Sequence, residues 1–114
     1  MPDIEQMVQF GFKRHQDGKL EEAESAYKEV LNVCGDNAEV CNLYSVLKLQ
    51  QDDISTAVEY AQKAVKLEPR AYYYETLCQA YIRNKDYKKI VDLESLINEA
   101  FSKHFPLLFN LALA

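Results

Sequence analysis

The feature that most limits what this chain can fold into is an internal repeat with a period of about 34 residues. One period back from Ala57 the sequence has Ala23, and one period forward it has Ile90. Three positions that precede these residues also recur with the same spacing in each unit. They hold Met7, Cys41 and Tyr74, then Phe10, Tyr44 and Leu77, then the small or medium residues Gly11, Ser45 and Cys78. A period of this length is typical of stacked supersecondary units.

Each repeating unit divides into two halves that have helical spacing. Met7, Phe10 and Gly11 follow the i, i+3, i+4 pattern that places side chains on one face of a helix. Polar breaks at 16–19 and 51–53 separate the two halves of the first and second units. We therefore expect each unit to be a pair of antiparallel helices. One such pair cannot bury its own apolar face, whereas stacked pairs can.

This pattern resembles the tetratricopeptide repeat, in which the first helix carries Leu-Gly and Tyr and the second carries Ala, an aromatic residue, Ala and Pro. The matching residues are Gly11, Ala23 and Tyr27 in the first unit, Ala57, Ala64 and Pro69 in the second, and Tyr74, Leu77 and Tyr81 in the third. The family's Trp is absent, Ile90 replaces an Ala, and Gly35 replaces the first Pro. The resemblance implies an all-α, right-handed superhelical solenoid of antiparallel helix pairs with about seven helices.

The repeat also predicts how the chain is divided. We expect one tetratricopeptide-like domain over residues 1–114, with repeats at about 4–37, 38–70 and 71–104. The resemblance covers about residues 4–114. A chain of 114 residues suits a single domain and hardly two.

The apolar end of the chain, residues 105–114, continues the same register. Leu108 and Leu111 lie one repeat period after Tyr74 and Leu77. We therefore expect the first helix of a partial fourth repeat here, and a chain that is the N-terminal part of a longer repeat protein. A helix that is apolar on all sides is normally buried. This predicts a homo-oligomer, by dimerisation or swapping through the C-terminal helix, with Phe109 and Leu113 in the contact.

Charge and cysteine content exclude several classes of function. With 13 Lys and Arg against 18 Asp and Glu, the net charge is −5, which argues against a nucleic-acid partner. No apolar run approaches the roughly 18 residues that span a bilayer, so no membrane partner is expected. Cys34, Cys41 and Cys78 lack CxxC spacing and neither histidine has ligand spacing, so we expect no disulfide, metal or cofactor, and a cytoplasmic location.

No catalytic constellation is evident. The serines lack a nucleophile elbow, and there is no Gly-rich phosphate loop. The acidic pairs at 21–22 and 52–53 come at the starts of second helices, where they favour the positive helix end. The sequence therefore predicts a non-catalytic protein-interaction scaffold. The alternative left open is the substrate-selecting or assembly arm of a larger enzyme, such as a glycosyltransferase, whose catalytic domain lies beyond residue 114.

In repeats of this kind the first helices line a concave groove, and their inward-facing residues are candidates for partner binding. Phe12, Val46 and Tyr72 are apolar side chains that a partner or a missing repeat would cover. One rim is acidic, with Glu5, Glu39 and Glu75 among the inward-facing residues. We expect His15 to be an ordinary exposed residue on this inner side. The candidate groove residues are Val8, Phe12, His15, Asn42, Val46, Gln50, Tyr72, Glu75, Gln79 and Arg83.

One subclass of ligand is disfavoured. Tetratricopeptide domains that hold the C-terminal carboxylates of chaperones use Lys, Asn and Arg on the inner face. This chain has Val8, Phe12, Leu43, Tyr72 and Thr76 at the matching places. The expected partner is therefore an apolar or mildly basic protein or peptide segment, which the acidic rim complements.

Overall fold

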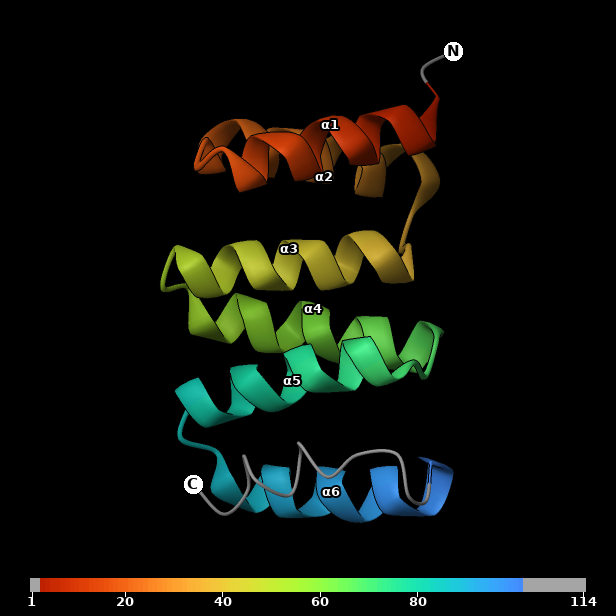
Figure 1. The fold of residues 1–114 in the computed structure, drawn as a ribbon, viewed down its shortest axis with the longest axis vertical. Helices are drawn as coiled ribbons and strands as arrows, with labels where there is room; N and C mark the ends of the chain where they lie inside the picture. The colour runs from red at the N-terminus through yellow and green to blue at the C-terminus, as the bar shows by residue number, and fades with distance from the viewer. Residues whose placement is uncertain (1–2, 102–114) are drawn as a thin grey trace.

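The computed structural model describes residues 3–101, apart from the side chains of 96–101, and these residues form a stack of six α-helices (Figure 1). The helices are α1 (Ile4–Gln16), α2 (Leu20–Cys34), α3 (Ala38–Gln50), α4 (Ile54–Leu67), α5 (Ala71–Arg83) and α6 (Tyr87–Phe101). The expected all-α solenoid of antiparallel helix pairs is confirmed. The seventh expected helix at 105–114, with Phe109 and Leu113, lies outside the described residues, so self-association through it stays a prediction.

The turns inside the three helix pairs share one backbone geometry. Gly18, Asp52 and Lys85 each adopt a left-handed conformation, with φ of 81°, 64° and 59°. In each turn the N–H of the next residue bonds to the carbonyl five residues earlier at 2.9 Å. This pattern is the Schellman motif that ends helices. Successive turns are one repeat period apart, so the sequence period reappears in the backbone.

Small residues in the first helices let the two helices of a pair approach closely. A Cβ atom on Gly11 would lie 2.7 Å from Cε1 of Tyr27, so only glycine fits at this α1–α2 contact. At the corresponding place in the second pair, the Ser45 hydroxyl donates to the carbonyl of Ala57 at 2.7 Å. Cys78 is buried at this place in the third pair, as the sequence predicts.

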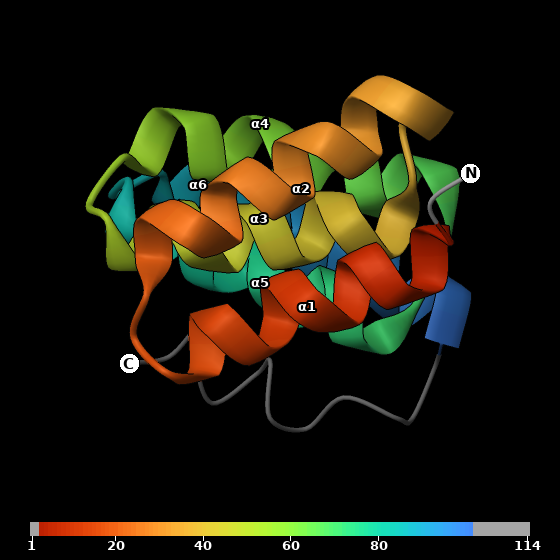
Figure 2. The same cartoon turned by 90° about the horizontal axis from the view of Figure 1, so that it is seen from above.

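The first helices form one continuous surface. Helix α1 contacts α3, and α3 contacts α5. Seen from above, α2 and α4 lie on one side of the stack, and α1 and α5 lie on the other (Figure 2). This arrangement places the inward-facing residues of α1, α3 and α5 beside one another.

A charged cluster joins the first helix pair to the second. The carboxylate of Glu24 on α2 accepts from Lys48 at 3.0 Å and from Gln51 at 3.2 Å, and lies 3.1 Å from Lys28. The hydrogen bond from Lys48 is the main cause that lowers the pKa of Glu24 from 4.5 to about 2. The cluster therefore holds α2 against the C-terminal end of α3 while Glu24 is ionised.

Candidate interaction groove

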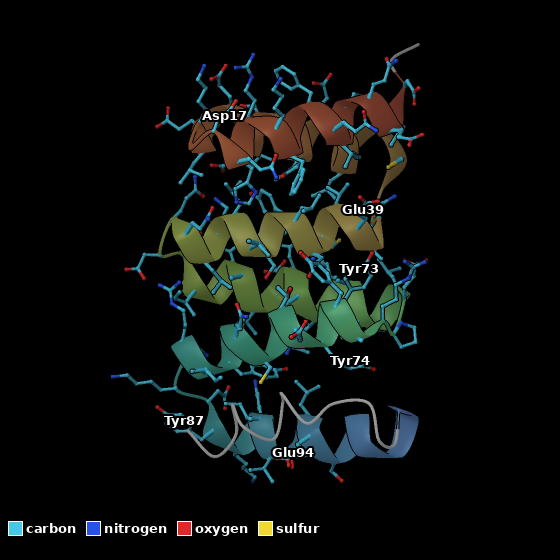
Figure 3. All side chains as sticks on the ribbon, viewed as in Figure 1. Asp17, Glu39, Tyr73, Tyr74, Tyr87 and Glu94 are labelled. Atoms are coloured by element: carbon cyan, nitrogen blue, oxygen red, sulfur yellow. The ribbon has the colours of Figure 1, made fainter. Side chains whose placement is uncertain are left out.

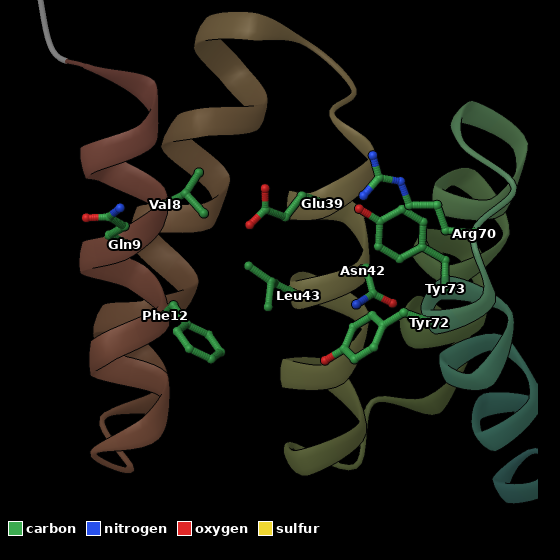
Figure 4. Close-up of a pocket in the computed structure, with 9 residues that line it drawn as sticks. All are labelled: Val8, Gln9, Phe12, Glu39, Asn42, Leu43, Arg70, Tyr72 and Tyr73. Carbon is green, nitrogen blue, oxygen red and sulfur yellow. The ribbon is translucent and has the colours of Figure 1, made fainter.

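A cavity of about 440 Å³ opens on the surface of the first helices, close to the starts of α3 and α5 (Figure 4). Four of the ten predicted groove residues line it: Val8, Phe12, Asn42 and Tyr72. The other lining residues are Gln9, Glu39, Leu43, Arg70 and Tyr73. Three helices thus contribute to one hollow, as the predicted concave groove requires.

The walls of this cavity are apolar and partly open to solvent. Figure 4 shows Phe12 on α1 and Tyr72 at the start of α5 on opposite sides of the hollow, with Leu43 of α3 between them. Phe12 is 42% exposed and Tyr72 is 59% exposed, whereas Val8 and Leu43 are buried. The two exposed rings therefore offer apolar surface that a bound side chain could remove from water.

The polar groups of the cavity have free bonding capacity. Asn42 is only 1% exposed, and its Oδ1 has no hydrogen-bond partner among the described residues. A buried acceptor in this state costs about 1–3 kcal/mol, which a donor on a ligand would recover. Glu39 is exposed and forms no ion pair within the described part of the chain. Burial raises the pKa of Tyr73, so its hydroxyl stays protonated.

The structure corrects the expectation for His15, which is buried rather than exposed. Its Nε2 contacts Oε1 of Gln50, and its Nδ1 lies 3.2 Å from the hydroxyl of Tyr27. Because an amide oxygen only accepts, Nε2 of His15 donates to Gln50, and Nδ1 shares a hydrogen bond with the hydroxyl of Tyr27. Burial raises the pKa of Tyr27 to about 12, which keeps its hydroxyl protonated. His15 and Gln50 therefore join α1, α2 and α3 and do not line the cavity.

The remaining predicted groove residues also lie outside the cavity. Arg83 donates from Nη1 to the carbonyl of Leu49 at 2.7 Å and from Nη2 to Asp52 at 3.0 Å. It thereby ties the end of α5 to the turn between α3 and α4. Val46 and Glu75 are half-buried, and Gln79 is exposed. These side chains share the surface of the first helices but are not brought together with Phe12 and Tyr72.

Sequence reasoning missed three of the lining residues. Arg70 lies in the connection before α5, where the helical period gives no information. Gln9 and Tyr73 are immediate neighbours of Val8 and Tyr72. A projection that also counted the immediate neighbours of each inward-facing position would have included both.

Other kinds of site find no support in residues 3–101. In that range, no group of three or more His, Cys, Asp and Glu side chains could hold a metal ion. No helix in the described part is long and apolar enough to cross a membrane. Cys41 and Cys78 are buried and Cys34 is exposed, and all three are free thiols in the structure.

Comparison with known proteins agrees with this architecture. Residues 38–70 match the family model described as tetratricopeptide repeat. The chain has the tetratricopeptide-repeat fold. Among solved structures, the first TPR of Spaghetti (RPAP3) bound to the HSP90 peptide SRMEEVD matches with a TM-score of 0.80. The match has 16% sequence identity and covers 95% of this chain and 89% of that one. No curated protein matches the chain.

The tetratricopeptide fold accounts for the coarse features of the candidate site. At 16% identity the match shows a shared fold. It does not extend to the side chains that line the cavity.

Proposed function

We propose that this chain is a protein-interaction scaffold that binds a segment of a partner protein in the groove of α1, α3 and α5. The observation that carries the proposal is the cavity in which two exposed aromatic rings, Phe12 and Tyr72, flank Asn42, whose buried Oδ1 has no hydrogen-bond partner among the described residues. Binding sites commonly combine apolar walls with a few convergent polar groups. The matching structure, which holds a peptide, gives this reading support at the level of the fold.

The chemistry of the cavity favours an apolar or mildly basic segment. An apolar side chain of the partner would insert between Phe12 and Tyr72. Asn42 offers one donor and one acceptor group, which suits a peptide bond of the partner backbone. Glu39 would pair with a nearby lysine or arginine, and the net charge of −5 acts in the same direction over longer distances.

A carboxylate ligand is disfavoured for the same reasons. The HSP90 peptide in the matching structure, SRMEEVD, carries three acidic residues. In this chain the Lys, Asn and Arg expected of carboxylate-holding members are replaced, and Val8, Phe12 and Leu43 form apolar walls instead. Arg70 at the same cavity is paired with Glu68, whereas Glu39 is left to repel anions, so we expect peptides with acidic ends to bind weakly. A cytoplasmic setting for this function stays a prediction.

Selection from a random-peptide display library with the chain as bait tests the proposal. We expect a consensus with an apolar anchor beside a basic residue. Tyr72→Ala should weaken binding of the selected peptide by about 1–2 kcal/mol, or roughly 5- to 30-fold. About 100 Å² of ring surface becomes buried at about 25 cal/mol per Å², and only part of that appears as affinity.

Tyr87 supplies the matched control. This tyrosine on α6 is also exposed, at 62%, and does not line the cavity. Tyr87→Ala should leave the affinity unchanged. An acidic consensus, or equal losses from Tyr72→Ala and Tyr87→Ala, would contradict the proposal.

A further inference from the structure

A second apolar hollow lies on the outer face of the first helix pair. This cavity of about 310 Å³ sits between α1 and α2. Phe10 is 49% exposed there, although the sequence places it in the repeated apolar frame. The lining residues are Met7, Phe10, Glu22, Ser25, Ala26 and Glu29. Phe10, Glu22, Ser25 and Glu29 face solvent, so the hollow is accessible and separate from the groove.

The repeat itself shows what covers the equivalent surface one unit further on. The counterparts of Met7 and Phe10 are Cys41 and Tyr44, and both are buried. Tyr44 packs in one core cluster with Tyr27 of α2. At that junction the second helix of the preceding pair therefore covers the face. In the first pair the guanidinium of Arg14 lies 4.9 Å from the centre of the Phe10 ring, and no helix in the described residues covers that ring, so the outer face can accept a helix.

The charges at the rim of this face indicate which helix would fit. In the second pair Lys63 lies 4.0 Å from Asp36, which follows α2. The counterpart of Lys63 in the first pair is Glu29, so the charge at this position is negative instead of positive. Glu22 lies at the same rim, and neither it nor Glu29 has an ion-pair partner in residues 3–101. An occupant that carries basic residues at its flanks would satisfy both carboxylates.

We propose that this outer face binds a basic amphipathic helix of a partner protein. The helix lies on α1 and α2 as α2 lies on α3 and α4 at the internal junction. One of its apolar residues fills the hollow beside Phe10, and its lysine or arginine side chains pair with Glu22 and Glu29. The upper end of the stack in Figure 3, where α1 and α2 lie, is then a second interaction surface, distinct from the groove.

Two stapled helical peptides test this site by fluorescence anisotropy with the full chain. Both carry the apolar residues of α4, and their flanking positions hold lysines in the basic probe and glutamates in the acidic probe. We expect the basic probe to bind at least about tenfold more tightly. Phe10→Asp should weaken its binding about tenfold or more. The double variant E22K/E29K should reverse the preference in favour of the acidic probe.

Tyr87→Asp is the matched control, because Tyr87 is an exposed aromatic residue that lines neither the groove nor this hollow. The control variant should bind the basic probe with the same affinity as the unaltered chain. Circular dichroism verifies that each variant folds. Equal binding of both probes, no binding, or dependence on Tyr87 instead of Phe10 would overturn the proposal. Self-association that requires Phe10 and excludes the basic probe would also overturn it, because a second copy would then be the occupant.

Discussion

Replacing Gly11 with alanine has two opposing effects on stability: it raises the helix propensity of α1 and it worsens the packing of α1 against α2. In an exposed helix interior the change would stabilise the fold by about 1 kcal/mol. At this position the new Cβ would lie 2.7 Å and 2.9 Å from two ring carbons of Tyr27, closer than carbon atoms normally approach. Tyr27 is fully buried and its hydroxyl lies 3.2 Å from Nδ1 of His15, so the ring has little room to move.

The helices α1 and α2 must therefore separate, at a cost of about 1–3 kcal/mol. After the propensity gain is subtracted, we expect Gly11→Ala to lower the free energy of unfolding by roughly 1 kcal/mol. For a domain of this size that corresponds to a fall in Tm of roughly 4 °C. Urea titration and thermal scans followed by far-UV circular dichroism measure both quantities.

The background variant Tyr27→Leu removes the ring that causes the clash. In this background Gly11→Ala should become close to neutral, because the propensity gain of about 1 kcal/mol remains while the Cβ of Ala26, 3.1 Å away, still crowds the new methyl group. The double-mutant cycle should give a coupling energy of about 1 kcal/mol. A rise in stability from Gly11→Ala in the unaltered chain, or the same effect in both backgrounds, would refute the packing argument.

Three further predictions concern other parts of the fold. Lys85→Gly should stabilise the chain by roughly 0.5–1 kcal/mol in urea titrations, because Lys85 has a left-handed φ of 59° that glycine adopts without a steric penalty. Glu24, whose pKa falls from 4.5 to about 2 on folding, should contribute about 1–2 kcal/mol above pH 4.5 and lose this as the pH falls towards 2. Glu24→Gln should flatten that acid-induced loss, and an unchanged pH profile would count against the cluster with Lys48. Cys34 should react with a thiol reagent much faster than Cys41, whose pKa burial raises to about 11, as mass spectrometry of partly labelled chain can establish.

The elements that follow from local pattern were predictable from the sequence. The repeat period marked the helix pairs, because small residues such as Gly11 and the polar breaks recur at fixed positions. Tyr72 and Asn42 were placed in the groove by helical projection, which needs only knowledge of which helices face inward. Phe12 followed in the same way.

What depends on contacts between distant residues could not be predicted. His15 is buried because Gln50, far along the chain on α3, reaches its ring, and no local pattern encodes that contact. Arg70 joins the cavity through the course of a connection rather than through a helical period. Phe10 fits the apolar frame, yet it is exposed because the surface on which it lies is not covered by a second helix in the described part of the chain.

Chemical-shift mapping by NMR tests the central claim most directly. The ¹⁵N-labelled chain is titrated with a peptide selected from the display library, and the perturbed amides are assigned. The account predicts the largest shifts around Phe12, Asn42 and Tyr72, with those around Glu29 and Tyr87 unchanged. Shifts confined to α4 and α6, or to the outer face of α2, would show that the partner segment binds elsewhere and would contradict the groove assignment.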